Sequence, residues 1–178
     1  AIELRKSDSL ELIRRIEGFP GKVNSVEFSA DGKSIVAGTG IVGLSGQAVI
    51  LSAESGERLK TIDAHRDTLY AARLSPDGKL LATASYDRMI ILRDASTGEV
   101  SQTLAGHNGP VFDLAFSPDG TLLASASADA TVKIWNVATG LRLDTLGQPL
   151  KEQYVVRFSP DGRFVISGGL DNRIRVWR

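Results

Sequence analysis

The chain contains no cysteine, only two histidines and a single methionine. Without cysteine there are no disulfide bonds and no thiolate metal sites, and the compartment stays open, with the cytoplasm as the default expectation. Positive and negative side chains number 21 each, so the formal net charge is zero and no long-range field favours nucleic acid or an anionic membrane as a partner. No apolar run approaches the roughly 18 residues of a membrane span. We expect no metal, no cofactor, no nucleic acid and no membrane among its partners.

One tetrapeptide occurs four times, as Ser-Ala-Asp-Gly from residue 29 and as Ser-Pro-Asp-Gly from residues 75, 117 and 159, so the copies are 46, 42 and 42 residues apart. A repeat of about 40–45 residues made of short strands is typical of a propeller blade. Repeats of this size cannot bury their faces alone and are stabilised by their neighbours. The sequence therefore predicts an all-β repeat protein rather than a chain with one catalytic pocket.

Each repeat is predicted to form a four-stranded antiparallel sheet, with strands a to d. Apolar runs on both parities, such as 122–124, indicate strands covered on both faces. The first repeat is four residues longer in its b–c connection, within 38–46. The d–a and b–c connections lie at the same end of every blade, which we call the top face. The predicted units are strands c and d of a preceding or closing blade (1–17), blade one (18–62), blade two (63–104), blade three (105–146) and blade four without strand d (147–178).

Four blades need 16 strands, whereas this pattern provides one more and leaves the last blade without strand d. We therefore expect about four blades that are part of a larger ring, or a ring completed by a second copy of the chain.

The third repeat resembles the WD40 family. The residues that carry the resemblance are Gly106-His107, Ser125, Asp129 and Trp135-Asn136. In that family the histidine, hydroxyl, carboxylate and indole groups form a hydrogen-bonded network within the blade. Such a network suits their chemistry, because the indole only donates, the carboxylate only accepts and the hydroxyl does both.

The other repeats keep only part of this network. The second has His65, Thr83 and Asp87, with Arg93 in place of the tryptophan. The fourth has Ser167, Asp171 and Trp177, with Pro149 in place of the histidine. The first has Phe19, Ala37, Ser45 and Leu51 at these positions. Blade one is therefore expected to depend on apolar packing.

Two motifs suggest chemistry that the repeat pattern argues against. His107, Ser125 and Asp129 are the residue types of a hydrolytic triad, but Ser125 lies within a predicted buried strand, and a nucleophile must face a cleft. The segment 38–43 matches the G-x-G-x-x-G fingerprint of dinucleotide sites, but another strand follows it where that motif needs a helix. We predict a structural role for the first and a flexible glycine-rich hairpin loop for the second, with contact to a partner as the alternative.

Aromatic residues recur at one register near the top of the first strands, at Tyr70, Phe112 and Tyr154, whereas blade one has Asn24 there. Packing is one interpretation of this column and partner binding is the other, because aromatic side chains concentrate contact energy. The resemblance implies a partner site on the top face, where Tyr86, Arg66 and Asn108 would join the column. The basic residues of 151–178, Arg157 among them, are interpreted as a solvated rim.

The predicted function is that of a noncatalytic scaffold, not an enzyme, which binds a protein or peptide partner through the top face. Two alternatives remain open. The chain is a fragment of a larger multidomain protein, for which the closely similar repeats suggest a bacterial source, and another domain is catalytic. Or its role is purely structural assembly through edge-strand completion.

Overall fold

The computed structural model describes residues 1–147 and 151–178. These residues form 17 strands and no helix, which confirms the predicted all-β fold. The strands are β1 (Ile2–Arg5), β2 (Leu12–Ile16), β3 (Lys22–Phe28), β4 (Ser34–Ile41), β5 (Ser45–Ser52), β6 (Arg58–His65), β7 (Leu69–Leu74), β8 (Leu80–Ser85), β9 (Ile90–Asp94), β10 (Val100–Leu104), β11 (Val111–Phe116), β12 (Leu122–Ser127), β13 (Val132–Asn136), β14 (Arg142–Leu146), β15 (Gln153–Phe158), β16 (Val165–Gly169) and β17 (Ile174–Trp177).

Strands that follow one another in sequence pair in antiparallel sheets. Three sheets have four strands (β3–β6, β7–β10 and β11–β14), one has three (β15–β17) and one has two (β1–β2). In the described part of the chain no helix is long and apolar enough to cross a membrane. This succession of meander sheets confirms propeller blades as the architecture, and the division at residues 18, 63, 105 and 147 remains our proposal.

The repeated tetrapeptide forms the turn between the first two strands of each large sheet. In the second copy the Ser75 hydroxyl donates to Asp77 Oδ1 (2.6 Å) and accepts from the Leu80 amide (2.9 Å). Gly78 has a φ of 72°, a left-handed conformation that costs glycine little. The hydrogen bond from Ser75 lowers the pKa of Asp77, so the carboxylate accepts bonds within the turn over the whole physiological range. The motif recurs because each of its residues closes the same reversal.

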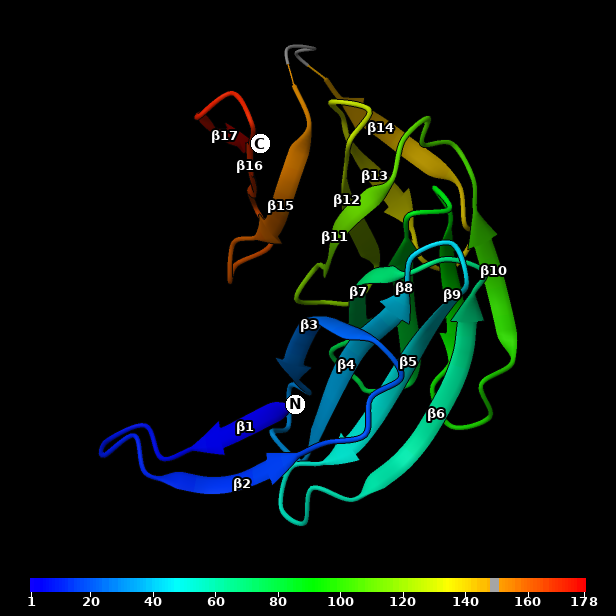
Figure 1. The fold of residues 1–178 in the computed structure, drawn as a ribbon. Coiled ribbons are helices and arrows are strands. Elements are labelled where there is room, and N and C mark those ends of the chain that lie inside the picture. Colours follow the sequence, from blue (N-terminus) through cyan, green and yellow to red (C-terminus); the bar gives the residue numbers. More distant parts are fainter. Residues whose placement is uncertain (148–150) are drawn as a thin grey trace.

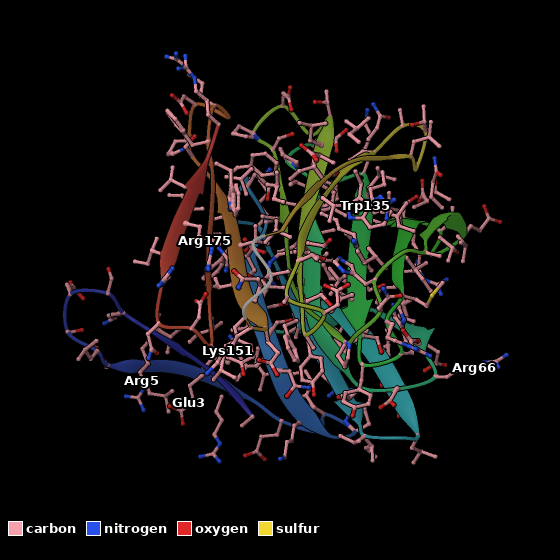
Figure 2. The ribbon with its side chains drawn as sticks, turned by 90° about the horizontal axis from the view of Figure 1, so that it is seen from above. Glu3, Arg5, Arg66, Trp135, Lys151 and Arg175 are labelled. Atoms are coloured by element: carbon pink, nitrogen blue, oxygen red, sulfur yellow. The ribbon has the colours of Figure 1, made fainter. Side chains whose placement is uncertain are left out.

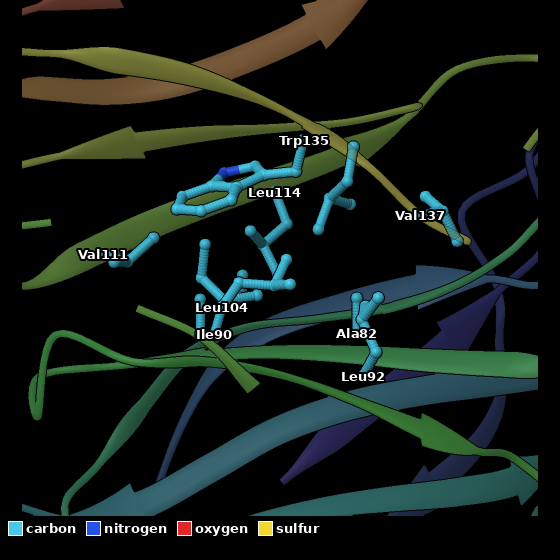
Figure 3. Packing of buried hydrophobic residues seen from close by; sticks show 11 residues of the cluster. Ala82, Ile90, Leu92, Leu104, Val111, Leu114, Trp135 and Val137 are labelled. Carbon is cyan, nitrogen blue, oxygen red and sulfur yellow. The ribbon is translucent and has the colours of Figure 1, made fainter. Parts of the chain in front are cut away.

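Neighbouring sheets pack face to face. Strand β7 contacts β3 and β4, β11 contacts β7 and β8, and β15 contacts β11 and β12. Between the second and third large sheets the fully buried side chains include Ile90, Leu92, Leu104, Leu114 and Trp135 (Figure 3). Burial of such side chains contributes about 1.5–3 kcal/mol each. The sheets therefore stabilise one another in series, as expected for repeats that cannot fold alone.

The series of sheets is an open arc (Figure 1). At one end Ile2 and Ile16 pack the β1–β2 pair against Ile35, Val49 and Leu51 of the β3–β6 sheet. At the other end lies the β15–β17 sheet. Strand β2 pairs with β1 and β17 with β16, and the described residues contain no pairing between β2 and β17. In this structure the first strands do not complete the last sheet.

The insertion in the first repeat is a longer hairpin rather than a flexible loop. Strands β4 and β5 each have eight residues, and only 42–44 lie between them. A side chain at Gly46 would meet the Asp67 carbonyl oxygen at 2.1 Å, and one at Gly40 would meet the Thr68 Cα at 2.7 Å. These glycines let the hairpin lie against the segment that leads into β7. The G-x-G-x-x-G match therefore lies at the end of β4 and in the turn after it, and strand β5 follows where a dinucleotide site needs a helix.

Candidate functional site

Four side chains of the β11–β14 sheet form one chain of hydrogen bonds. Trp135 Nε1 donates to Ser125 Oγ (2.9 Å), Ser125 Oγ lies 2.7 Å from His107 Nε2, and His107 Nδ1 lies 2.8 Å from Asp129 Oδ2. Because the indole can only donate and the carboxylate can only accept, Ser125 donates to Nε2 and Nδ1–H donates to Asp129. Every bond of the chain then runs in one direction through a neutral imidazole.

The electrostatics of this network favour a neutral histidine beside an ionised aspartate. Burial lowers the pKa of His107, and the opposing effect of Asp129 does not restore it. Burial acts to raise the pKa of Asp129, but hydrogen bonds from His107, Thr131 and the Asn108 amide outweigh it and hold that pKa well below its ordinary value. The ion-pair geometry of the two groups is thus a charge-assisted hydrogen bond, not a pair of full charges.

We expect the protein to lose stability as the pH falls below about 6.5, the ordinary histidine pKa. The unfolded histidine binds a proton there, whereas the lowered pKa of His107 keeps the folded imidazole neutral until a lower pH. The contribution of Asp129 is lost only further into acid, because its folded pKa is also lowered. Urea unfolding at about pH 7.5 and 5.5 measures the first loss. His107→Gln should remove most of the difference between the two pH values, and an unchanged difference would contradict the assignment.

The second sheet keeps three of the four positions. His65 Nδ1 lies 2.9 Å from Asp87 Oδ2, and His65 Nε2 lies 3.0 Å from Thr83 Oγ1. Arg93 replaces the tryptophan but does not continue the chain, since its guanidinium donates to the carbonyl oxygens of Gly98 and Ala64. The Arg93 Nε is buried without a hydrogen-bond partner. Burial lowers the pKa of Arg93.

In the last sheet the expected residues are not all brought together. Trp177 Nε1 donates to Ser167 Oγ (3.4 Å), and Ser167 donates to Gln153 Oε1 (3.1 Å). Asp171 instead accepts from Arg175 Nη1 (3.2 Å). The fourth repeat has no histidine that could link Ser167 to Asp171. Pro149, at the histidine position, lies outside the described residues. Gln153 thus accepts from the serine hydroxyl, as His107 Nε2 does in the third sheet.

The triad-like residues are built into the sheet. Ser125 is fully buried, and its Oγ already accepts from Trp135 Nε1. A serine nucleophile needs room for a substrate carbonyl and for oxyanion donors beside it. The geometry of Ser125, His107 and Asp129 is therefore that of a buried hydrogen-bond network that stabilises the blade.

The recurring aromatic residues form a continuous row, which we call the aromatic row and which consists of Tyr86, Tyr70, Phe112 and Tyr154. The ring centroids of Tyr70 and Phe112 are 5.1 Å apart and those of Phe112 and Tyr154 are 5.3 Å apart. Tyr86 lies 6.3 Å from Tyr70. Tyr86 and Tyr154 are each 46% exposed, and the two residues between them are half-buried. The row crosses three sheets. Its side chains pack against one another and are also partly exposed to solvent.

Two further residues predicted for this face lie outside the row. Arg66 is exposed and projects from one edge of the molecule (Figure 2). Asn108 is exposed, and its backbone amide donates to Asp129 Oδ2 (2.9 Å), which supports the third network. The participation of both residues in a partner site on the top face remains our prediction.

A group of charges on the first strands of the four larger sheets was missed by the sequence analysis. Arg73 Nε lies 2.9 Å from Glu27 Oε2, Arg73 Nη2 lies 2.6 Å from Asp113 Oδ1, and Arg157 Nη1 lies 2.5 Å from Asp113 Oδ2. We call these four residues the inner ladder. The side chains of Arg73 and Asp113 are only 10% and 7% exposed. The available signal was a charge inside an otherwise apolar strand. The Arg157 side chain is 52% exposed, so this residue is solvated as interpreted and in addition pairs with Asp113.

Comparison with known proteins agrees with this architecture. The WD domain, G-beta repeat family matches residues 10–45, 56–94, 98–136 and 150–178. Among curated proteins, Protein HIR1 of Phaeosphaeria nodorum is 35% identical over 83 residues, which are 47% of this chain and 8% of that protein. Protein hir1 of Emericella nidulans is 33% identical and Protein HIR1 of Coccidioides immitis 36% identical, each over 78 residues, or 44% of this chain and 7% of the relative.

The matched part thus spans less than a tenth of each of these relatives. The family match, in contrast, extends through all four repeats and includes the third-sheet network with its His107 and Trp135. The resemblance inferred from the residues is confirmed, and the chain belongs to the WD40-repeat family.

Proposed function

We propose that this chain is a noncatalytic scaffold that binds a protein or peptide partner through the aromatic row. The observation that supports the proposal is the continuity of the row: four rings from three sheets contact one another, and its two ends are partly open to solvent. Tyrosine and phenylalanine are frequent anchors of protein interfaces, because they bury much area at a small entropic cost. The row rests on packed sheets, so little ordering is needed when a partner binds.

The test uses peptides selected from a random library displayed on phage against the full chain. Tyr86→Ala and Tyr154→Ala together should weaken their binding by about tenfold or more, as expected for interface anchors. Phe28→Ala is the matched control, because Phe28 is an exposed aromatic residue at the turn end of β3. If the peptides bind the double variant as tightly as the original chain, the row is packing only and the proposal fails.

The alternative proposal is that the chain is part of a longer protein, in which this scaffold binds or positions a ligand and another domain is catalytic. The HIR1 relatives support this alternative, since the matched segments are a small part of them.

A second candidate role is assembly through the open face of the β15–β17 sheet. Ile166, Ile174 and Val176 are 39%, 81% and 63% exposed on this face. The residues at the same repeat positions of the preceding sheet, Ala124, Val132 and Ile134, are buried in the cluster that includes Val156 and Val165 of the last sheet. A further sheet of the same kind therefore fits this face, and we propose that a second copy supplies it.

The mass in solution, measured by light scattering over a range of concentrations, tests this assembly. A dimer that Ile174→Asp converts to a folded monomer is the expected result. A monomer at every concentration would exclude association of two copies through the last sheet.

A further inference from the structure

The hairpin tip of the first repeat, residues 41–44, presents apolar side chains to solvent. Ile41 is 42% exposed, and Val42 and Leu44 are each 69% exposed. Water-exposed aliphatic residues at a turn are unfavourable for solubility, since turns are normally polar. The tip is held in place, because the Gly43 amide donates to Asp67 Oδ1 (2.7 Å) and the Leu44 amide to the Ile41 carbonyl (3.0 Å). The exposed apolar group is therefore fixed above the connection that leads into β7.

A recess of about 320 Å³ lies between this tip and the aromatic row. Ile41 and Val42 line one side of it, and Tyr70, a member of the row, lines another. Its floor is fixed, because Asn24 Nδ2 donates to Thr68 Oγ1 (3.1 Å) and to the Leu69 carbonyl (2.7 Å). The recess is thus open, largely apolar, and continuous with the surface proposed above.

One charged side chain lines the recess. Lys22, at the start of β3, is exposed, and none of the ion pairs among residues 1–147 and 151–178 involves it. Asp67, in the connection below the tip, accepts at Oδ1 from the amides of Gly43 and Thr68 and is not part of the lining. A ligand in the recess therefore meets apolar walls and one positive charge at its rim.

We propose that this recess is the anchor pocket of the scaffold and takes a large apolar side chain of an extended partner peptide, with an adjacent aspartate or glutamate of that peptide against Lys22. The inference rests on the proposed function and names the class of peptide. The apolar side chain covers the walls formed by Val42 and Tyr70, and the carboxylate pairs with the ammonium group. The insertion of four residues in the first repeat then has a role, because it places the tip over this end of the row.

The experiment compares two variants of the same turn, with peptides selected from the phage library against the full chain. The enriched peptides should share an apolar residue next to an acidic one. Val42→Asp should weaken their binding by about tenfold or more, because it places a second carboxylate against the ligand. Leu44→Asp is the matched control, equally exposed at 69% but outside the lining, and should change the affinity by less than about twofold.

Charge reversal provides an independent readout. Lys22→Glu should weaken the binding of the acidic peptides by about tenfold, and a second selection against this variant should enrich basic peptides. Lys33→Glu, in the turn at the other end of the sheet, should change neither result. Circular dichroism of each variant confirms that the fold is retained.

Three results would overturn the inference. If Tyr86→Ala with Tyr154→Ala abolishes binding and Val42→Asp does not, the scaffold binds elsewhere on the row and only the anchor pocket is wrong. If the library yields no peptide, the pocket and the proposed function both fail. If Val42→Asp and Leu44→Asp both dissociate a dimer of the chain, the tip contacts a second copy instead.

Discussion

Replacing Asp113 by alanine should lower the free energy of unfolding by about 3–5 kcal/mol, the usual cost of removing one partner of a buried ion pair. Asp113 is the acceptor for both Arg73 and Arg157, and it also accepts from the Val156 amide (3.1 Å). Without it, the buried guanidinium of Arg73 keeps only Glu27 as an ionic partner and faces a second arginine. Urea unfolding followed by tryptophan fluorescence measures the loss.

Ser25 offers a matched comparison for Asp113. It stands at the same register in β3 and accepts from the Ala72 amide (3.2 Å), as Asp113 accepts from the amide of Val156. Ser25→Ala removes only that neutral bond and should cost about 0.5–1.5 kcal/mol. Arg73→Met combined with Asp113→Leu should be less destabilised than Asp113→Ala, because no buried charge is left uncompensated. Equal losses for Asp113→Ala and Ser25→Ala would show that the ladder charges contribute nothing.

Replacing Ser125 by alanine should cost about 2–6 kcal/mol. The change leaves two buried groups without a partner, the Trp135 indole N–H and His107 Nε2, and each stranded group costs about 1–3 kcal/mol. Ser125→Thr keeps the hydroxyl, and threonine stands at the corresponding position of the second sheet, at Thr83. This variant should stay within about 1 kcal/mol of the original chain, apart from the fit of the added methyl group.

Ser167→Ala is the control within the same protein. The bond from Trp177 to Ser167 is 3.4 Å long, and Trp177 is only half-buried, so water can satisfy the indole after the change. Only one buried group then loses its partner, Gln153 Oε1, so the cost should be about 1–3 kcal/mol and smaller than that of Ser125→Ala. If Ser125→Ala is no more destabilising than Ser167→Ala, the four-residue network does not stabilise the third sheet.

The elements that sequence analysis predicted are those encoded by local patterns. The Ser-x-Asp-Gly turns are predictable because their hydrogen bonds join residues at most five positions apart. The network of His107, Ser125 and Asp129 was found because a family resemblance relates residues 18 and 22 positions apart. Both are properties of one repeat, and one repeat can be compared with the next.

The inner ladder was not predictable in the same way, because its contacts join different repeats. Arg73 and Asp113 are 40 residues apart and occupy different registers of their strands, so no column of the repeat contains both. The hydrogen-bond partner of Asp171 was also missed. The fourth repeat has no histidine, and Asp171 accepts from Arg175 in the next strand instead. The glycines near residue 40 were interpreted as loop residues, because glycine is common in loops. The structure shows that they are needed where the backbone of another segment approaches closely.

The charged groups on β3, β7, β11 and β15 also bear on how the protein meets another molecule. They tie together the four strands nearest the open centre of the arc, three of which carry Tyr70, Phe112 and Tyr154. Cross-links of this kind resist changes in the tilt of one blade relative to the next. The distances between the rings are therefore fixed before a partner binds. The protein should select partners whose contacting side chains have the same spacing as the rings.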